Sequence, residues 1–591
     1  MFRGWEYCEA AARLARTVVL AASACAALAL GGEAYSQTVE RHEAPGLQTP
    51  TTPPVAPPEP TADQDTRPLG ANLAAVSLLT ADDPLPSSVA PGRIDSHLLA
   101  PPHGSALDHR LGKFIGQPLS RALISRIEAV IVDHYRRAGR PFVAVKLPPQ
   151  DITDGTLRLR VIEFRLGHKS ASGASAAVDR SITDGVRAQA GDVIDGNQLQ
   201  QDLDWLNHSP FRTVTAVFAP GADTGVTDLA LQAQSVKPWQ AFAGYSNSGT
   251  PSDGLDRWML GGEIGDLIRP GSLVSYELTA SDDFWFGHNR LFGAADYPQY
   301  VSHSLVVALP LAPRQDFTVV ADYLQSTTPS QAFDVTSRTT EISAVYRTAL
   351  SNFVPAPGDG SIGVEVRGQR SDTDFGAAQV AQTNVDVAQL VFGWSDAWTD
   401  PRWRQSLSLN FRLSPGGLWG GNTNSDFLKA SNGRVGKANY DYADIDYSGD
   451  FHIAGAWRYV TSVNIQIANQ ALLSTEQMAL GGDPGVRLYV YDDRSFDNGV
   501  IWRNELRTPP VGLWSGPAGS TVLSPYLFVD AGYGQDFKID TEQYASSFGA
   551  GSDWRFGKHL SGGVTGGLAL QNAAYTRAGE FNLLANLRFT Y

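Results

Sequence analysis

The carboxy-terminal stretch of the chain alternates apolar and polar side chains without a break. Successive side chains of a strand point to opposite sides, so the alternation separates an apolar face from a polar one. Such faces are typical of an outer-membrane β-barrel strand, with lipid on one side and a wet lumen on the other. The edge strand of a soluble sheet is the alternative. The apolar set is Phe581, Leu583, Ala585, Leu587, Phe589 and Tyr591, and the polar set is Asn582, Asn586, Arg588 and Thr590.

Residues 238–591 repeat this alternation. Further segments with one apolar and one polar face are 274–281, 362–369, 406–413 and 457–467. At about 22 residues for a strand and its loop, the region predicts a transmembrane antiparallel β-barrel of about 16 strands, an even number as such barrels have. Residues 438–453 alternate poorly, which predicts a bulge or a long surface extension there.

The amino-terminal residues 1–36 have the features of a secretory signal peptide. Three arginines precede an apolar run, residues 17–30, which is too short to span a bilayer as a helix, and small side chains predict cleavage after Ser36. Lipid attachment at Cys25 is the alternative, but the large aliphatic residue expected three positions earlier is absent. Because the other cysteine is Cys8, we expect a mature chain without disulfides.

Residues 37–68 are crowded with prolines and polar side chains, which predicts an extended, mobile linker. Whether the first residues of this linker plug a pore is left open.

After the linker, the periodicity changes to that of two small α+β units, residues 69–166 and 167–237. Each unit predicts an amphipathic helix, residues 123–138 and 199–206, followed by two strands. The predicted strands are 142–147 and 156–163 in the first unit, and 213–218 and 227–232 in the second.

Composition excludes several classes of function. Hydrophobic residues make up 42% of the chain, but no long uncharged apolar segment follows residue 36. This argues against a helical membrane protein. A net charge of -15 argues against nucleic-acid binding, which needs a basic footprint. No HExxH pair, GxSxG elbow or phosphate-binding loop is found, so we expect no catalytic residue and no cofactor. An acyl hydrolase is the enzyme alternative, and it would need Ser, His and an acid converging on one lipid-facing surface.

A group of acidic residues near the end of the predicted barrel raises the question of a calcium site. Asp492, Asp493, Asp497 and Asn498 lie close together in sequence, but the segment lacks the glycine and the terminal glutamate of a hand-type loop. The histidines, 11 in all, are scattered. We therefore expect a solvated loop and no metal.

Three stretches resemble TpsB transporters, the pore-forming partner in two-partner secretion and haemolysin activation. Residues 135–167 are similar to the first POTRA domain of that family, and residues 206–231 to the second. Residues 244–258 resemble its first barrel hairpin. The resemblance implies POTRA domains at 69–166 and 167–237. It places the barrel in the outer membrane of a Gram-negative bacterium, with these domains in the periplasm.

Residues 478–509 resemble the long sixth loop of these transporters, whose hallmark is a Val-Arg-Gly-Tyr tetrad. Here the tetrad reads Val486, Arg487, Leu488 and Tyr489. Leucine replaces a glycine that permits a tight turn without steric cost, and its effect on the turn is left open. The resemblance implies that the loop folds back into the lumen and that the arginine meets an acid of the inner wall.

The wall segment that matches the family comprises Phe528, Asp530 and Gly532. Strand parity places Phe528 and Asp530 on the face opposite Leu527 and Val529. Asp530 is thus expected to point inward and to form a forked ion pair with the arginine of the loop.

The resemblance implies a secretion pore and no enzyme. Its POTRA domains are expected to capture a large, unfolded TpsA-like exoprotein by sheet-edge addition or along a groove, before the exoprotein threads the barrel. The other expected partners are outer-membrane lipid and the barrel assembly machinery, which in related proteins reads the last strand, here Phe589 and Tyr591. The alternatives are an assembly factor for outer-membrane proteins and a passive porin. Two POTRA domains and the Pro-rich tether favour secretion.

Overall fold

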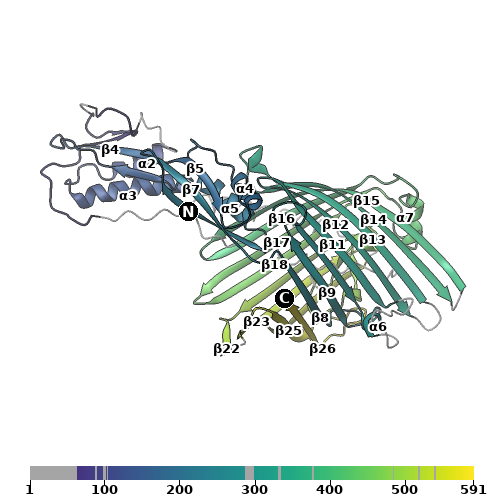
Figure 1. The fold of residues 1–591 in the computed structure, drawn as a ribbon. Coiled ribbons are helices and arrows are strands. Elements are labelled where there is room, and N and C mark those ends of the chain that lie inside the picture. Colours follow the sequence, from purple (N-terminus) through teal and green to yellow (C-terminus); the bar gives the residue numbers. More distant parts are fainter. Residues whose placement is uncertain are drawn as a thin grey trace.

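The computed structural model describes residues 63–86, 89–96, 102, 104–286, 298–329, 334–375, 378–482, 485–516, 519–537 and 541–591. Two α+β units lie beside one end of a closed β-barrel (Figure 1). The predicted fold class is therefore confirmed. The predicted signal peptide, residues 1–36, and both cysteines lie outside the described residues. Within the described part of the chain, no helix combines the length and the apolar composition needed to cross a bilayer.

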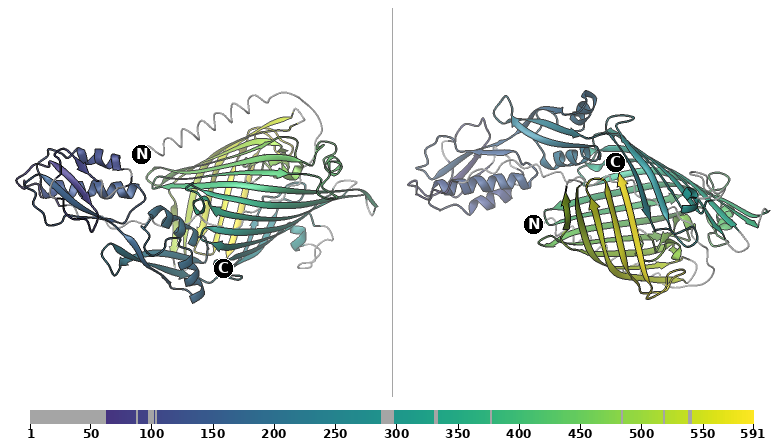
Figure 2. Two further views of the ribbon diagram at one scale, coloured as in Figure 1. Left: turned by 90° about the horizontal axis from the view of Figure 1, so that it is seen from above. Right: turned by 60° about the horizontal axis from the view of Figure 1, so that its bottom comes forward.

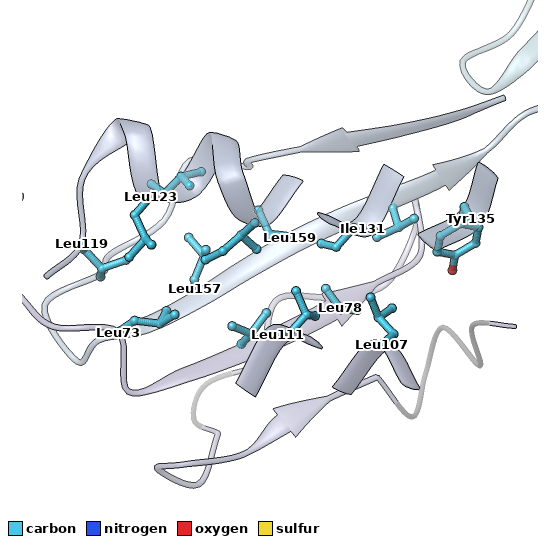
Figure 3. Close-up of a cluster of buried hydrophobic side chains, with 14 residues drawn as sticks. Leu73, Leu78, Leu107, Leu111, Leu119, Leu123, Ile131, Tyr135, Leu157 and Leu159 are labelled. Atoms are coloured by element: carbon cyan, nitrogen blue, oxygen red, sulfur yellow. The ribbon is translucent and has the colours of Figure 1, made fainter. Parts of the chain in front are cut away.

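The first unit packs α2 (Gly104–Gly112) and α3 (Arg121–Arg137) against a four-stranded sheet. In the order β2-β1-β4-β3, its strands are β2 (Ile94–Asp95), β1 (Ala75–Leu79), β4 (Thr156–Glu163) and β3 (Val143–Lys146). α3 begins where the Ser120 hydroxyl accepts a hydrogen bond from the Leu123 amide, at 3.1 Å. Figure 3 shows side chains of both helices pointing toward Leu157 and Leu159 of β4, which together form the core.

The described end of the predicted linker, residues 37–68, contacts this first unit. The Asp63 amide donates to the Ser125 hydroxyl at 3.2 Å, and the Ala122 amide donates to the Asp65 carbonyl at 2.9 Å. Residues Asp63 and Asp65 of the predicted linker are therefore hydrogen-bonded to α3, ahead of the boundary predicted at residue 69.

The second unit contains α4 (Ala176–Asp184) and α5 (Gly196–Leu206) and a sheet of order β5-β7-β6. Its strands are β5 (Arg165–Ser172), β6 (Arg212–Pro220) and β7 (Val226–Ser235). The sequence pattern predicts α5, β6 and β7 but misses β5 and α4. In α4 only Val178 and Ile182 are buried, which is too short a stripe to stand out as a helical period.

Arg187 connects the second unit to the barrel. Its Nε donates to the buried Asp202 carboxylate at 2.6 Å. Its Nη1 donates to the Ser351 hydroxyl at 2.9 Å and to the Asn352 side-chain oxygen at 3.1 Å, both in the turn between two barrel strands. One guanidinium thus joins the core of the unit to the rim of the barrel. Figure 2 shows the second unit lying against this end of the barrel.

The barrel is one antiparallel sheet closed by pairing of its last strand with its first. β21 and β22 both pair with β23 and are separated by Pro509 and Pro510, so they form one interrupted strand of a 16-stranded barrel within the described residues. The strands are β8 (Trp239–Ser246), β9 (Arg257–Gly265), β10 (Leu273–Ala280), β11 (Tyr300–Ala312), β12 (Gln315–Pro329), β13 (Asp334–Ala349), β14 (Asp359–Phe375), β15 (Ala378–Asp400), β16 (Trp403–Ser414), β17 (Tyr440–Ala454), β18 (Trp457–Ala468), β21 (Asn498–Arg507), β22 (Val511–Gly516), β23 (Gly519–Gln535), β24 (Glu542–Phe556), β25 (Leu560–Ala569) and β26 (Phe581–Thr590). The short helices α6 (Asp282–Phe286) and α7 (Asn424–Ala430) lie in loops between strands.

β17 decides between the two alternatives predicted for residues 438–453. The surface extension is wrong, because residues 440–454 form one strand. The predicted bulge agrees with a shift of the register with β18 between His452 and Ala454. The alternation is weak because Tyr440 and Tyr442 face inward and pack in an apolar cluster with Phe427 of α7. Because these lumen-facing side chains are largely apolar, the difference in polarity between the two faces, by which a barrel strand is recognised, is small here.

The end of β26 is held against the first strand by backbone and ring contacts. The Tyr591 amide donates to the Ala241 carbonyl at 2.8 Å, and the Ala241 amide donates back at 3.2 Å. The Tyr591 ring lies 5.9 Å from the Trp239 ring and beneath the Lys237 ammonium, at 5.4 Å. The His559 ring stacks on the Tyr591 ring with a centroid distance of 6.2 Å and lies tilted beside the Phe589 ring at 6.0 Å. The terminal aromatic therefore completes the barrel closure.

Replacement of Phe589 and Tyr591 by Ser should sharply reduce the amount of folded barrel, because it removes these ring contacts and an apolar face exposed to lipid. Heat-modifiable barrel in outer-membrane fractions measures the effect. Phe353→Ser is the control, since this ring is 70% exposed in a turn at the same rim. Normal barrel levels in the double variant would contradict the prediction.

Candidate functional site

The loop between β18 and β21 enters the barrel. Its described residues, 469–482 and 485–497, include the short pair β19 (Met478–Ala479) and β20 (Ser495–Phe496) and two single 3-10 turns, η3 (Ser474–Glu476) and η4 (Tyr491–Asp493). Loop side chains such as Leu480 and Phe496 are buried in a cluster with wall residues of β21 and β24. We call this segment the lumen loop. The resembling segment 478–509 therefore contains a strand as well, because residues 498–507 are β21.

Arg487 of the lumen loop meets Asp530 of β23. The guanidinium donates through Nε to Oδ2 at 2.6 Å and through Nη2 to Oδ1 at 2.7 Å, and the Asp530 side chain is 0% exposed. Leu527 and Val529 are exposed on the opposite face, so Asp530 lies on the lumen side. The Phe528 ring lies under the guanidinium, with its centroid 4.3 Å away. The structure thus forms the two-pronged contact that parity and resemblance predicted.

Glu505 of β21 is a second acid at the same arginine that the sequence analysis missed. Arg487 Nη1 donates to Glu505 at 2.5 Å, and Arg507 Nε donates to the other oxygen of Glu505 at 2.6 Å. The sequence could have revealed Glu505, because it lies on the strand face opposite Trp502 and Leu506. These two side chains are exposed on the outer face, so Glu505 points inward. Two arginines and two acids therefore balance one another beside the loop.

Leu488 adopts a backbone conformation that favours glycine. Its φ is +73°, in the left-handed region that costs an ordinary residue about 1–2 kcal/mol. Its side chain is buried against Tyr526, Phe528 and Leu584, and burial of a leucine contributes about 1.5–3 kcal/mol. The Asn582 side chain donates to the Leu488 carbonyl at 3.0 Å. The leucine therefore makes an apolar contact with the wall at a position whose conformation favours glycine.

Gly532 leaves room for the loop. A Cβ atom at this position would come within 2.7 Å of both Leu480 and Val486 side-chain carbons. Gly534, two positions along β23, lies in the same way beneath the Phe496 ring. The wall strand thus offers a flat surface on which the apolar side chains of the lumen loop pack.

Tyr489 and Asp493 attach the loop to the neighbouring wall and to the last loop of the barrel. The Tyr489 hydroxyl accepts from the Gln571 amide at 3.0 Å and lies 3.2 Å from the Ser546 carbonyl. Asp493 accepts from the Tyr575 and Thr576 amides at 2.7 Å and 2.9 Å.

The expectation of a solvated loop is wrong for Asp493 and Asp497. Both side chains are buried, and Arg434, in the loop that follows β16, donates to both oxygens of Asp497, at 3.0 Å and 2.9 Å. The lumen loop lies among wall side chains, so its acids bond to protein rather than to water. Among the described residues, no group of His, Cys, Asp and Glu side chains has an arrangement that could hold a metal ion.

Comparisons with known proteins agree with this architecture. The family model "Haemolysin secretion/activation protein ShlB/FhaC/HecB" matches residues 225–555, and "POTRA domain, ShlB-type" matches residues 101–163. The outer membrane transporter CdiB of Dickeya dadantii is 23% identical over 414 residues, which cover 68% of each chain. The heme/hemopexin transporter protein HuxB of Haemophilus influenzae is 21% identical over 446 residues, 73% of each.

Solved structures show the same fold. CdiB from Escherichia coli superposes with a TM-score of 0.67 at 18% identity, covering 92% of this chain and 94% of that one. CdiB from Acinetobacter baumannii superposes with a TM-score of 0.58 at 15% identity, covering 98% and 97%. The family match covers more than half of the chain, so the predicted resemblance is confirmed. This chain belongs to the ShlB/FhaC/HecB family of haemolysin secretion/activation proteins and is an outer-membrane secretion pore.

Proposed function

We propose that the two periplasmic α+β units capture a large, unfolded exoprotein and pass it into the barrel, through which it reaches the cell surface. The contact of Arg187 with the barrel rim carries this proposal, because it keeps the second unit at the pore entrance. The proposed domains are residues 69–166 and 167–237, followed by the barrel at 238–591. We assign the free energy that drives translocation to folding of the cargo outside the cell, because a folded cargo cannot easily return through the lumen.

Open sheet edges in the periplasmic units support the capture step. Within the described residues, β6 pairs only with β7, so its other edge carries unpaired backbone groups. An extended segment of cargo can add to such an edge through main-chain hydrogen bonds, which demand little of its sequence. This mode suits a chain that must be held unfolded and then released.

We further propose that the lumen loop obstructs the pore at rest and rearranges during secretion. Arg487 and Asp530 position it, supported by Val486, Leu488 and Tyr489. Breaking a buried pair by removing one partner costs about 3 to 5 kcal/mol, since the remaining charge is left unpaired. A loop without this contact is held less firmly in the lumen. No catalytic step is assigned to the site, in keeping with a family of transporters.

The assembly-factor alternative shares the barrel class, but the family match favours secretion. A large secreted protein encoded beside this gene is the expected cargo. Co-expression of the two should release that protein to the medium, and removal of this chain should retain it in the cell. Retention that does not depend on this chain would rule out the secretion function for that cargo.

Arg487→Ala and Asp530→Ala should each lower cargo release at least about tenfold, because the lost docking energy exceeds the 1.4 kcal/mol that corresponds to that factor. Barrel abundance should stay nearly normal. The measurement is cargo in the medium per folded barrel. Arg458→Ala is the matched control, because its ion pair with Asp450 is exposed at the rim, with 50% of the Arg458 side chain accessible. Release that falls equally in the control would show a general effect of arginine loss.

Leu488→Ile should loosen the lumen loop, although leucine and isoleucine have side chains of the same composition. A β-branched residue fits poorly at a φ of +73°, whereas Leu488→Gly relieves the strain and loses the packing. The isoleucine variant should therefore make the loop more accessible to protease in intact outer membranes than the glycine variant does. Leu480→Ile is the control, a buried leucine of the same loop. Equal protection of the Leu488→Ile variant and the unchanged protein would contradict the strained turn.

A further inference from the structure

A second charged contact holds the lumen loop on another wall. Arg367 of β14 donates through Nε to Glu341 of β13 at 2.7 Å and through Nη2 to Glu365 at 3.2 Å. Its Nη1 donates to the Thr475 carbonyl at 2.8 Å and pairs with the Glu476 carboxylate. Only 5% of the Arg367 side chain is exposed. Every charge in this cluster therefore depends on its protein partners rather than on water.

Glu476 is the member that the loop contributes. Its Oε2 accepts from the Tyr442 hydroxyl of β17 at 2.8 Å and from the Gln389 amide of β15 at 3.1 Å. Its backbone carbonyl accepts from the Gln466 side chain of β18 at 3.0 Å. Together with Arg367, side chains from four strands converge on this one residue of the loop.

The two charged contacts lie on different parts of the wall. Arg367 is on β14 and Asp530 is on β23, and β15, β16, β17, β18 and β21 lie between them in barrel order. Glu476 and Arg487 are close in sequence, so one loop contacts both parts of the wall. A loop fixed at both points stays in the lumen when only one contact breaks.

We propose that Glu476 is a second positioning residue of the secretion pore. With Arg367 it holds the base of the lumen loop, and the loop leaves the lumen only when this contact and the contact between Arg487 and Asp530 are both broken. This inference rests on the proposed obstruction of the pore by the loop. It requires no further partner, because all the groups belong to this chain.

The charges of the cluster predict an asymmetry between its two central residues. Without Glu476, Arg367 keeps Glu341 and Glu365 in the barrel wall, so the wall remains balanced while the base of the loop loses its anchor. Without Arg367, three carboxylates lose their shared counter-charge, and Arg412 stays beside Glu365 at 3.4 Å. Removal of Glu476 should therefore loosen the loop in a stable barrel, whereas removal of Arg367 should lower the amount of folded barrel.

Conductance of the full-length protein in planar bilayers tests the proposal. The variants are Glu476→Ala, Asp530→Ala, the two combined, and deletion of residues 477–496 as the reference for an emptied lumen. Each single substitution should raise the ratio of open to closed time about tenfold or more, with closures still observed. The combined variant should show the steady, enlarged current of the deletion. Glu476→Gln, which retains the shape without the charge, should lie between the unchanged protein and Glu476→Ala.

Glu263→Gln is the matched control, because Glu263 is a buried glutamate of β9 that accepts from Gln240 at 2.5 Å. The proposal is overturned if Glu476→Ala conducts like the unchanged protein, or if the combined variant closes as often as Asp530→Ala alone. A deletion variant with an unchanged current would instead overturn obstruction by the loop, and with it the proposed gating. The amount of heat-modifiable barrel in Arg367→Ala tests the asymmetry, which normal levels would contradict.

Discussion

The forked ion pair between Arg487 and Asp530 is the contact on which the rest of the lumen depends. Both side chains are nearly inaccessible to water, so neither can be left without the other at small cost. Glu505 and Arg507 extend the pair into a balanced group of charges on neighbouring strands. A loop that carries an arginine into a barrel is stable only where the wall offers acids at the matching register. The alternation of β21 and β23 provides that register.

Around this charge, the shape of the wall decides how closely the loop can approach. Gly532 removes a side chain where Leu480 and Val486 pack, and Leu488 accepts backbone strain in exchange for apolar contact. Strain and burial have similar magnitudes here, about 1–2 against about 1.5–3 kcal/mol, so the docked loop gains little net energy from this residue. The buried ion pair of Arg487 and Asp530, rather than Leu488, therefore holds the loop on the wall.

Much of this fold could be predicted because a transmembrane strand faces lipid on one side and the lumen on the other, and its sequence alternates apolar and polar residues accordingly. Strands with unbroken alternation such as β26 repeat the signal often enough to be recognised, and parity alone placed Asp530 on the lumen side. The weak alternation of β17 left a bulge and a surface extension open, because buried tyrosines lie on its lumen face, and α4 is too short to show a period. Local signals could not reveal the pair of Arg367 and Glu476, because the residues lie 109 positions apart and meet only through barrel closure. The roles of Arg487 and its loop came from family resemblance rather than from spacing.

A double-mutant cycle on Arg487 and Asp530 tests the central claim most directly. Cargo released per folded barrel is measured for the unchanged protein, for each alanine variant and for the variant that carries both substitutions. If the two residues act as one contact, the double variant secretes no less than either single variant, because the second substitution removes a charge that the first has already left unpaired. Losses that add in the double variant would show that the residues act separately, and positioning of the loop by this ion pair would have to be abandoned.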